Sequence, residues 1–164
     1  MLGQKNLNAF NYRVDSDPSS AAFLIALALL TPNAKLTIHN CLCNESRIGF
    51  YKLLKYKGKA NIKKKNLRKS PNSGELVGSI VAKNSSIKPI NCSKRLAPSL
   101  IDELPILFVI AALTKGVSKF QGINEITKKE SNRMEEMRKI LIQIGIRCKT
   151  TKDEMIIYGK NKID

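Results

Sequence analysis

The stretch AAFLIALALL, residues 21–30, decides the fold, because a second stretch of the same kind, LPILFVIAAL, follows at residues 104–113. Continuous apolar runs of this composition predict buried helices rather than amphipathic surface helices. Each run ends in a threonine, Thr31 or Thr114, and then meets a turn residue, Pro32 or Gly116. The spacing of about 85 residues indicates one recurring supersecondary unit.

Each apolar run is followed by a second predicted helix. Apolar residues three and four positions apart around residues 50–54 and 137–141 indicate these helices. Gly58 and Gly145 come next and suit a left-handed helix stop. Strands are expected at residues 35–38 and 117–120 after the first helices, at 60–62 with 76–82 and 146–148 with 155–158 as closing hairpins, and at 10–14 and 87–90 as opening strands.

These elements predict an α+β fold, a mixed sheet with inner helices. Two repeated β-α-β-α-β-β units are expected, unit one at about residues 10–83 and unit two at about residues 87–159. We expect residues 1–164 to form one incomplete domain.

The formal net charge of +16 raises the possibility of a polyanionic partner. Lysine greatly outnumbers arginine, and aromatic residues are only 5% of the chain, whereas nucleic-acid binding favours arginine and interleaved aromatics. The basic run Lys63–Lys65 with Arg68 and Lys69 reads as a strand end and loop exposed to solvent. No nucleic-acid partner is therefore expected, and a basic nucleic-acid-binding module is kept as an alternative.

Neither a leader peptide nor a membrane span is expected, because residues 1–11 are polar and the apolar runs are shorter than the roughly 20 residues that a bilayer requires. A cytoplasmic protein without membrane association is expected. Cys41, Cys43, Cys92 and Cys148 form no C-x-x-C pair, and His39 is the one histidine. No metal site is expected, because a zinc site needs about four ligands at tight spacings.

The segment Lys129-Glu130-Ser131-Asn132-Arg133 precedes an amphipathic helix and places a carboxylate, Glu130, between two cations on one face. Helix starts also attract anions, so the segment suits an anionic substrate beside an acid or base. Asp102 and Glu103 precede Pro105 at another predicted helix start, where capping is the simpler interpretation. A solvated first turn is likewise the simpler interpretation of Lys129, Glu130 and Arg133 on spacing alone.

Five motifs, in order along the chain, resemble the 5-enolpyruvylshikimate-3-phosphate synthase family (3-phosphoshikimate 1-carboxyvinyltransferases). Ser16 stands where the family has glycine, Asn132 where it has aspartate and Glu125 where it has asparagine. The matching segments are Asp17-Pro18-Ser19-Ser20-Ala21-Ala22-Phe23, Asn44-Glu45-Ser46-Arg47-Ile48-Gly49, Gly74-Glu75-Leu76-Val77, Pro98-Ser99-Leu100-Ile101-Asp102-Glu103-Leu104-Pro105 and Lys129-Glu130-Ser131-Asn132-Arg133.

The resemblance implies transfer of the enolpyruvyl group of phosphoenolpyruvate to shikimate 3-phosphate with release of phosphate, in aromatic amino acid biosynthesis, without a metal or organic cofactor. It also implies that Asp102 is the base beside the shikimate hydroxyl and contacts that substrate. Glu130 would assist proton transfer at the methylene carbon of phosphoenolpyruvate, and Lys129 and Arg133 would bind phosphoenolpyruvate. Ser19 and Ser20 are interpreted as helix caps, and Arg47 as either structural or facing the cleft.

The family's enzymes are about two and a half times as long as this chain and have motifs without a counterpart here. We therefore expect a segment of the enzyme that has no activity alone and whose partner is the remainder of the parent enzyme. A segment of a UDP-N-acetylglucosamine enolpyruvyl transferase is the nearest alternative enzyme. That family relies on a reactive cysteine in a loop, and none of the four cysteines here lies in such a context.

Overall fold

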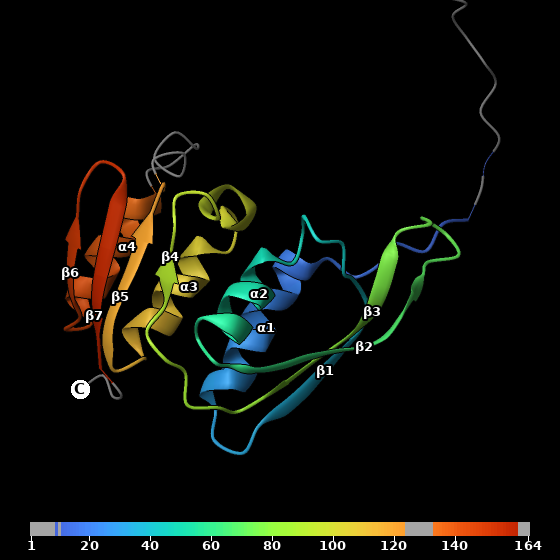
Figure 1. The fold of residues 1–164 in the computed structure, drawn as a ribbon, viewed down its shortest axis with the longest axis horizontal. Coiled ribbons are helices and arrows are strands. Elements are labelled where there is room, and N and C mark those ends of the chain that lie inside the picture. Colours follow the sequence, from blue (N-terminus) through green and yellow to red (C-terminus); the bar gives the residue numbers. More distant parts are fainter. Residues whose placement is uncertain (1–8, 10, 124–132, 161–164) are drawn as a thin grey trace, which may run out of the picture.

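The computed structural model describes residue 9, residues 11–123 and residues 133–160. Within these residues the fold is mixed α+β, which confirms the predicted class. Two sheets lie at opposite ends of the molecule, and helices α1, α2 and α3 lie between them (Figure 1).

The first sheet contains three antiparallel strands in the order β1-β3-β2. A single parallel bridge, Ser16 to Cys41, lies beside β1. Helices α1 and α2 pack on this sheet, α1 against β1 and β3 and α2 against β2. The elements are α1 (Pro18–Leu30), β1 (Lys35–Leu42), α2 (Gly49–Tyr56), β2 (Asn61–Lys69) and β3 (Leu76–Lys83).

The second sheet has the order β4-β5-β7-β6, and β4 runs parallel to β5 while the other pairs are antiparallel. Helices α3 and α4 cover it, and α3 also packs against α1 of the first half. The elements are β4 (Asn91–Cys92), the 3-10 helix η1 (Ala97–Leu100), α3 (Leu104–Ala112), β5 (Gly116–Gln121), α4 (Arg133–Gln143), β6 (Arg147–Thr150) and β7 (Glu154–Gly159).

The predicted opening strands are wrong in extent. Residues 11–15 form no strand, because side chains of the 70–73 turn hold them instead: Asn72 donates to the Arg13 carbonyl at 3.1 Å, and Ser73 donates to Asp15 at 2.7 Å. The second opening strand begins at Asn91 rather than in residues 87–90. Pro89 has no N–H group to contribute to a ladder.

The two predicted glycine helix stops have different outcomes. Gly145 adopts a φ of 76°, as expected for a left-handed stop. The prediction for Gly58 is wrong, because the following residue, Lys59, takes the positive φ of 56°. Gly58 serves close packing instead, since a Cβ atom there would lie 2.8 Å from the Leu54 carbonyl oxygen.

Helix α1 is buried on one side only. Ala22, Ile25 and Leu29 are fully buried, whereas Phe23, Leu24 and Leu27 are 53%, 53% and 63% exposed. The prediction of a buried helix is therefore wrong for this face, which the first sheet and α3 do not reach. Helix α3 is covered more fully and exposes Val109 as its one large apolar side chain above a third of its surface.

The last strand, β7, ends directly against the C-terminal turn of α3. A Cβ atom at Gly159 would overlap the carbonyl oxygens of Ala111 and Thr114, so only glycine permits this approach. The next N–H group, that of Lys160, donates to the Ala112 carbonyl at 2.9 Å. A carbonyl at the helix end is thus satisfied by the end of a strand far along the chain.

Burial determines the ionisation of the cysteine thiols in this structure. Cys41 lies in β1 and Cys43 directly after it, in agreement with the predicted strand or loop placement, and both are fully buried. Burial raises the pKa of Cys41 to about 12 and that of Cys92 to about 11, so both thiols stay protonated at neutral pH.

In the part of the chain that the structure describes, no helix is both long and apolar enough to cross a bilayer.

Candidate functional site

The turn before α3 packs directly onto the start of α2. Gly49, the first residue of α2, makes this possible, because a Cβ atom there would lie 2.7 Å from Ser99 Oγ and 2.8 Å from the Ser99 carbonyl oxygen. Contacts between α2 and η1 join the first half of the chain to the second at this point. The motif ending in Gly49 and the motif containing Asp102 are thereby brought together.

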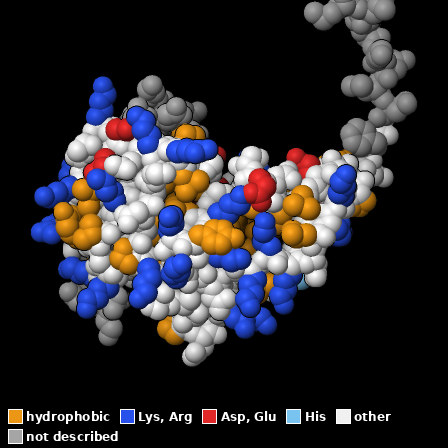
Figure 2. Space-filling view, in the orientation of Figure 1, with side chains coloured by type: hydrophobic (Ala, Val, Ile, Leu, Met, Phe, Trp, Pro, Cys, Tyr) orange, Lys and Arg blue, Asp and Glu red, His pale blue; other side chains and the backbone are white. Residues whose placement is uncertain are grey.

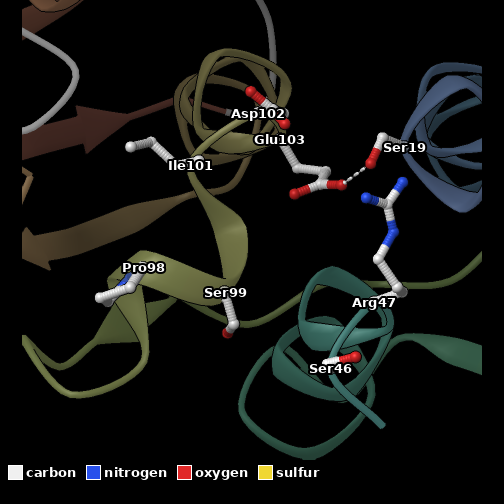
Figure 3. A pocket seen from close by; sticks show the side chains of 8 residues that line it. All are labelled: Ser19, Ser46, Arg47, Pro98, Ser99, Ile101, Asp102 and Glu103. Carbon is white, nitrogen blue, oxygen red and sulfur yellow. Dashed lines mark hydrogen bonds between the residues drawn. The ribbon is translucent and has the colours of Figure 1, made fainter. Parts of the chain in front are cut away.

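A pocket of about 110 Å³ lies where these segments meet the N-terminus of α1 (Figure 3). Glu103 and Arg47 extend toward each other across it, with Ser19 of α1 beside them, whereas the Asp102 carboxylate points away from Arg47 in this view. The lining residues are Ser19, Ser46, Arg47, Pro98, Ser99, Ile101, Asp102 and Glu103.

Glu103 is the buried acid of this pocket, with only 5% of its surface exposed. Ser19 Oγ–H donates to Glu103 Oε1, which links α1 to the turn before α3. Glu103 occupies the N-cap position of α3, yet its side chain makes no capping hydrogen bond. The capping interpretation is therefore wrong for Glu103, whose carboxylate instead holds two halves of the structure together.

Asp17, rather than Ser19 or Ser20, caps α1. Its Oδ2 accepts hydrogen bonds from the Ser20 N–H and the Ser20 hydroxyl, both at 2.8 Å, and its Oδ1 accepts one from Arg47 at 2.6 Å. Pro18 takes the first helical position, which moves the two serines into the first turn. The prediction of serine caps is wrong for this reason.

Several groups set the ionisation of Asp17. Partial burial raises its pKa, but hydrogen bonds from Ser20, Ser19 and Arg47 outweigh this effect and leave the pKa below its ordinary value of 3.8. A carboxyl whose pKa is lowered by folding stabilises the folded state above its unfolded pKa. This stabilisation disappears as pH falls through the folded pKa.

We expect Asp17→Ala to lower the free energy of unfolding by about 1 kcal/mol at pH 7, the usual cost of losing an N-cap. Asp17→Asn should recover most of this loss, because asparagine caps as well as aspartate. The difference between wild type and Asp17→Ala should shrink as pH falls below the ordinary pKa of 3.8. Urea unfolding followed by circular dichroism at pH 7 and pH 3 measures both effects, and equal stabilities at pH 7 would contradict the capping role.

The structure places two of the four predicted site residues. Asp102 is exposed in the turn that precedes α3 and lines the pocket. Arg133 is the exposed first residue of α4 and does not line this pocket. Lys129 and Glu130, together with Glu125, lie outside the described residues.

The helices share an orientation that bears on this site. In Figure 1, α1, α2, α3 and α4 all begin toward the upper edge of the molecule, so their N–H ends face the same side. Helix N-termini carry partial positive charge and favour anions. The edge that carries Asp102 and Arg133 therefore combines a carboxylate with an electrostatic preference for anionic groups.

Among residues 9, 11–123 and 133–160, no group of three or more His, Cys, Asp or Glu side chains gathers where it could hold a metal ion. The polar groups at the pocket are hydroxyls, two carboxylates and one guanidinium. Such groups can bind an anion, hold a hydroxyl and transfer a proton.

Sequence reasoning singled out Asp102 but assigned no site role to its neighbour Glu103. The partner of Glu103, Ser19, is 84 residues away, so no local spacing reveals the contact. A usable signal was the residue type, because a glutamate next to a buried apolar helix needs a partner if it is itself buried.

Comparison with known proteins finds the family that the five sequence motifs resemble, and the match extends along the whole chain. The family described as "EPSP synthase (3-phosphoshikimate 1-carboxyvinyltransferase)" matches residues 1–164. A 3-phosphoshikimate 1-carboxyvinyltransferase of Carboxydothermus hydrogenoformans is 39% identical over 163 residues, covering 99% of this chain and 36% of that protein. One of Bartonella quintana is 38% identical over 159 residues, covering 97% of this chain and 35% of that protein.

Solved structures agree with the sequence comparison. An EPSP synthase structure from Acinetobacter baumannii superposes with a TM-score of 0.85 at 36% identity, covering 93% of this chain and 34% of that one. A second structure from the same organism gives a TM-score of 0.83 and covers 99% of this chain. The chain thus spans about a third of the length of the proteins it matches.

Proposed function

The chain belongs to the EPSP synthase family, and we propose that it contributes part of the active site of a 3-phosphoshikimate 1-carboxyvinyltransferase. The observation that carries the proposal is the family match along residues 1–164. The substrates would be shikimate 3-phosphate and phosphoenolpyruvate. The relatives from Carboxydothermus hydrogenoformans and Bartonella quintana both carry the name of this enzyme, and neither carries that of the UDP-N-acetylglucosamine enzyme.

We propose that four residues bind the substrates or transfer protons. Asp102 contacts shikimate 3-phosphate and removes the proton of its 5-hydroxyl group, a role that its exposed position at the edge of the pocket supports. Lys129 and Arg133 bind the carboxylate or phosphate of phosphoenolpyruvate, and the exposure of Arg133 at the start of α4 supports this. Glu130 exchanges a proton with the methylene carbon.

The reaction has two steps. In the addition, the 5-hydroxyl oxygen bonds to C2 of phosphoenolpyruvate, Asp102 takes the hydroxyl proton, and Glu130 gives a proton to C3. In the elimination, the tetrahedral intermediate loses a C3 proton to Glu130 and phosphate from C2, and Asp102 returns its proton to the departing phosphate. Two positioned acid–base groups are required because protons move at both oxygen and carbon.

We also propose that the two halves are β-α-β-α-β-β repeat units of one incomplete domain that acts in the cytoplasm. The equivalent strand orders support the repeat, since β1, β3 and β2 correspond to β5, β7 and β6. The Ser16–Cys41 bridge is parallel, as is the pairing of β4 with β5. The exposed apolar face of α1 supports packing against the remainder of the parent enzyme.

The proposal is tested with a chimera in which residues 1–164 replace the aligned segment of the Carboxydothermus hydrogenoformans relative. Phosphate release from phosphoenolpyruvate and shikimate 3-phosphate is measured for the chimera and for the chain alone. The chimera is expected to turn over, and the chain alone is not, because it supplies one part of the site. A folded chimera that binds both substrates but releases no phosphate would refute the assignment, as would steady turnover by the chain alone.

A further inference from the structure

A second pocket lies between α2 and β2 and shares no lining residue with the Asp102 pocket. Its volume of about 370 Å³ falls within the roughly 300–1,000 Å³ typical of small-molecule sites. The lining residues are Glu45, Ile48, Tyr51, Lys52, Lys55, Tyr56, Ile62 and Lys64.

The walls of this pocket are apolar and firmly held. Ile48, Tyr51 and Ile62 are 1%, 4% and 3% exposed, so they are core side chains held in place at the base of the pocket, and the exposed Tyr56 adds accessible apolar surface. The Tyr51 hydroxyl donates to the Pro18 carbonyl at 2.5 Å, and its ring packs edge-on against Phe50. Burial raises the pKa of Tyr51, so the ring stays neutral and adds no negative charge to the pocket.

The rim is positively charged. Three lysines and one glutamate line the pocket, which leaves two positive charges in excess. Glu45 contacts both Lys52 and Lys64, the second at 3.7 Å, so a single carboxylate is shared between two ammonium groups. Lys55 has no carboxylate partner among residues 11–123 and 133–160, and its Nζ lies 5.4 Å from the centre of the Tyr56 ring.

The basic character continues past the rim. An adjoining hollow shares Lys55, Ile62 and Lys64 with the pocket and adds Lys59 and Lys63. In Figure 2, Lys and Arg side chains surround apolar ones over the central part of the molecule, where α2 lies in Figure 1. The basic run that the sequence placed at a strand end and loop lies within β2, and Lys63 and Lys64 meet the hollow from there.

We propose that the pocket between α2 and β2 binds a small organic monophosphate whose planar apolar body lies against Ile48, Tyr51 and Ile62. Its phosphate group would contact Lys55 and Lys64. A phosphomonoester carries close to two negative charges at neutral pH, which matches the two uncompensated positive charges of the rim. Lysine binds phosphate as a point charge, and the exposed Tyr56 ring can cover one side of the planar body.

The probe is 2-naphthyl phosphate, with the neutral 2-naphthol and inorganic phosphate as matched comparisons. The ¹H–¹⁵N spectrum of the chain is titrated with each compound. With 2-naphthyl phosphate, the shifts should concentrate at residues 45–64, and its dissociation constant should be about tenfold or more below those of the two comparison compounds, because only it has both the body and the charge.

Two charge-reversal variants complete the test. Lys55→Glu should weaken binding of 2-naphthyl phosphate by about tenfold or more, as expected when a charged hydrogen-bond partner is lost. Lys149→Glu, on β6 of the other sheet, makes the same change in net charge and should alter affinity less than about twofold. The proposal is overturned if inorganic phosphate binds as tightly as the probe, if both variants lose affinity equally, or if the shifts centre on the exposed face of α1.

Discussion

Replacing Asp102 by asparagine is expected to lower kcat of the chimera by about 10²- to 10⁴-fold, the usual contribution of a positioned general base. Asparagine keeps the size and hydrogen-bonding ability of the side chain but cannot accept the hydroxyl proton. Asp102 is exposed, so the substitution should leave the fold intact. Initial rates of phosphate release, with urea unfolding of the same samples, measure both effects.

The neighbouring acid provides the matched control. Glu103 is buried and accepts a hydrogen bond from Ser19, so Glu103→Ala should lower the free energy of unfolding by about 1–3 kcal/mol, the cost of a buried group left unsatisfied. Asp102→Asn should leave that free energy nearly unchanged. If Asp102→Asn retains more than about a tenth of the wild-type kcat, Asp102 is not the base.

Replacing Phe108 by alanine is expected to lower the free energy of unfolding by about 3–5 kcal/mol. The Phe108 ring is completely buried and packs edge-on against Phe120, with ring centres 5.0 Å apart. This contact joins α3 to β5, so the cavity left by the substitution lies between a helix and its sheet. Since domains have a total stability of about 5–15 kcal/mol, the variant should be close to unfolded at moderate temperature.

The next residue on the same helix is the control. Val109 is 37% exposed, so Val109→Ala removes fewer buried atoms and should cost less than about 1 kcal/mol. Thermal unfolding followed by circular dichroism compares the two variants directly. Equal losses would show that the helix itself, rather than the contact with Phe120, sets the stability.

The helices and most strands could be predicted because their signals are local. The run at residues 21–30 and the spaced apolar positions of α2 indicate helices through residues a few positions apart, although the run did not reveal the exposed face of α1. The opening strand predicted at residues 10–14 does not form at residues 11–14. There the Arg13 carbonyl accepts a hydrogen bond from the distant Asn72 side chain, and Ser73 donates to the Asp15 carboxylate. No pattern within that segment reveals this.

In the candidate site, too, features with local sequence signals could be predicted and contacts between distant segments could not. Asp102 was found because its motif is local and resembles that of a family. The cap at Asp17 was missed because Pro18 shifts the helix start by two residues, which places Ser19 and Ser20 inside the first turn. The pocket between α2 and β2 could not be predicted, since its lysines come from a helix and a strand that meet only in the folded chain.

The contact between β7 and the end of α3 sets an order of events during synthesis. The Ala112 carbonyl receives its hydrogen bond from the Lys160 N–H group, and Gly159 presses against the same helix turn. A ribosome adds residues one at a time from the N-terminus, so α3 leaves it well before this partner exists. The last turn of α3 therefore lacks this hydrogen bond until β7 has been made and has paired with β5.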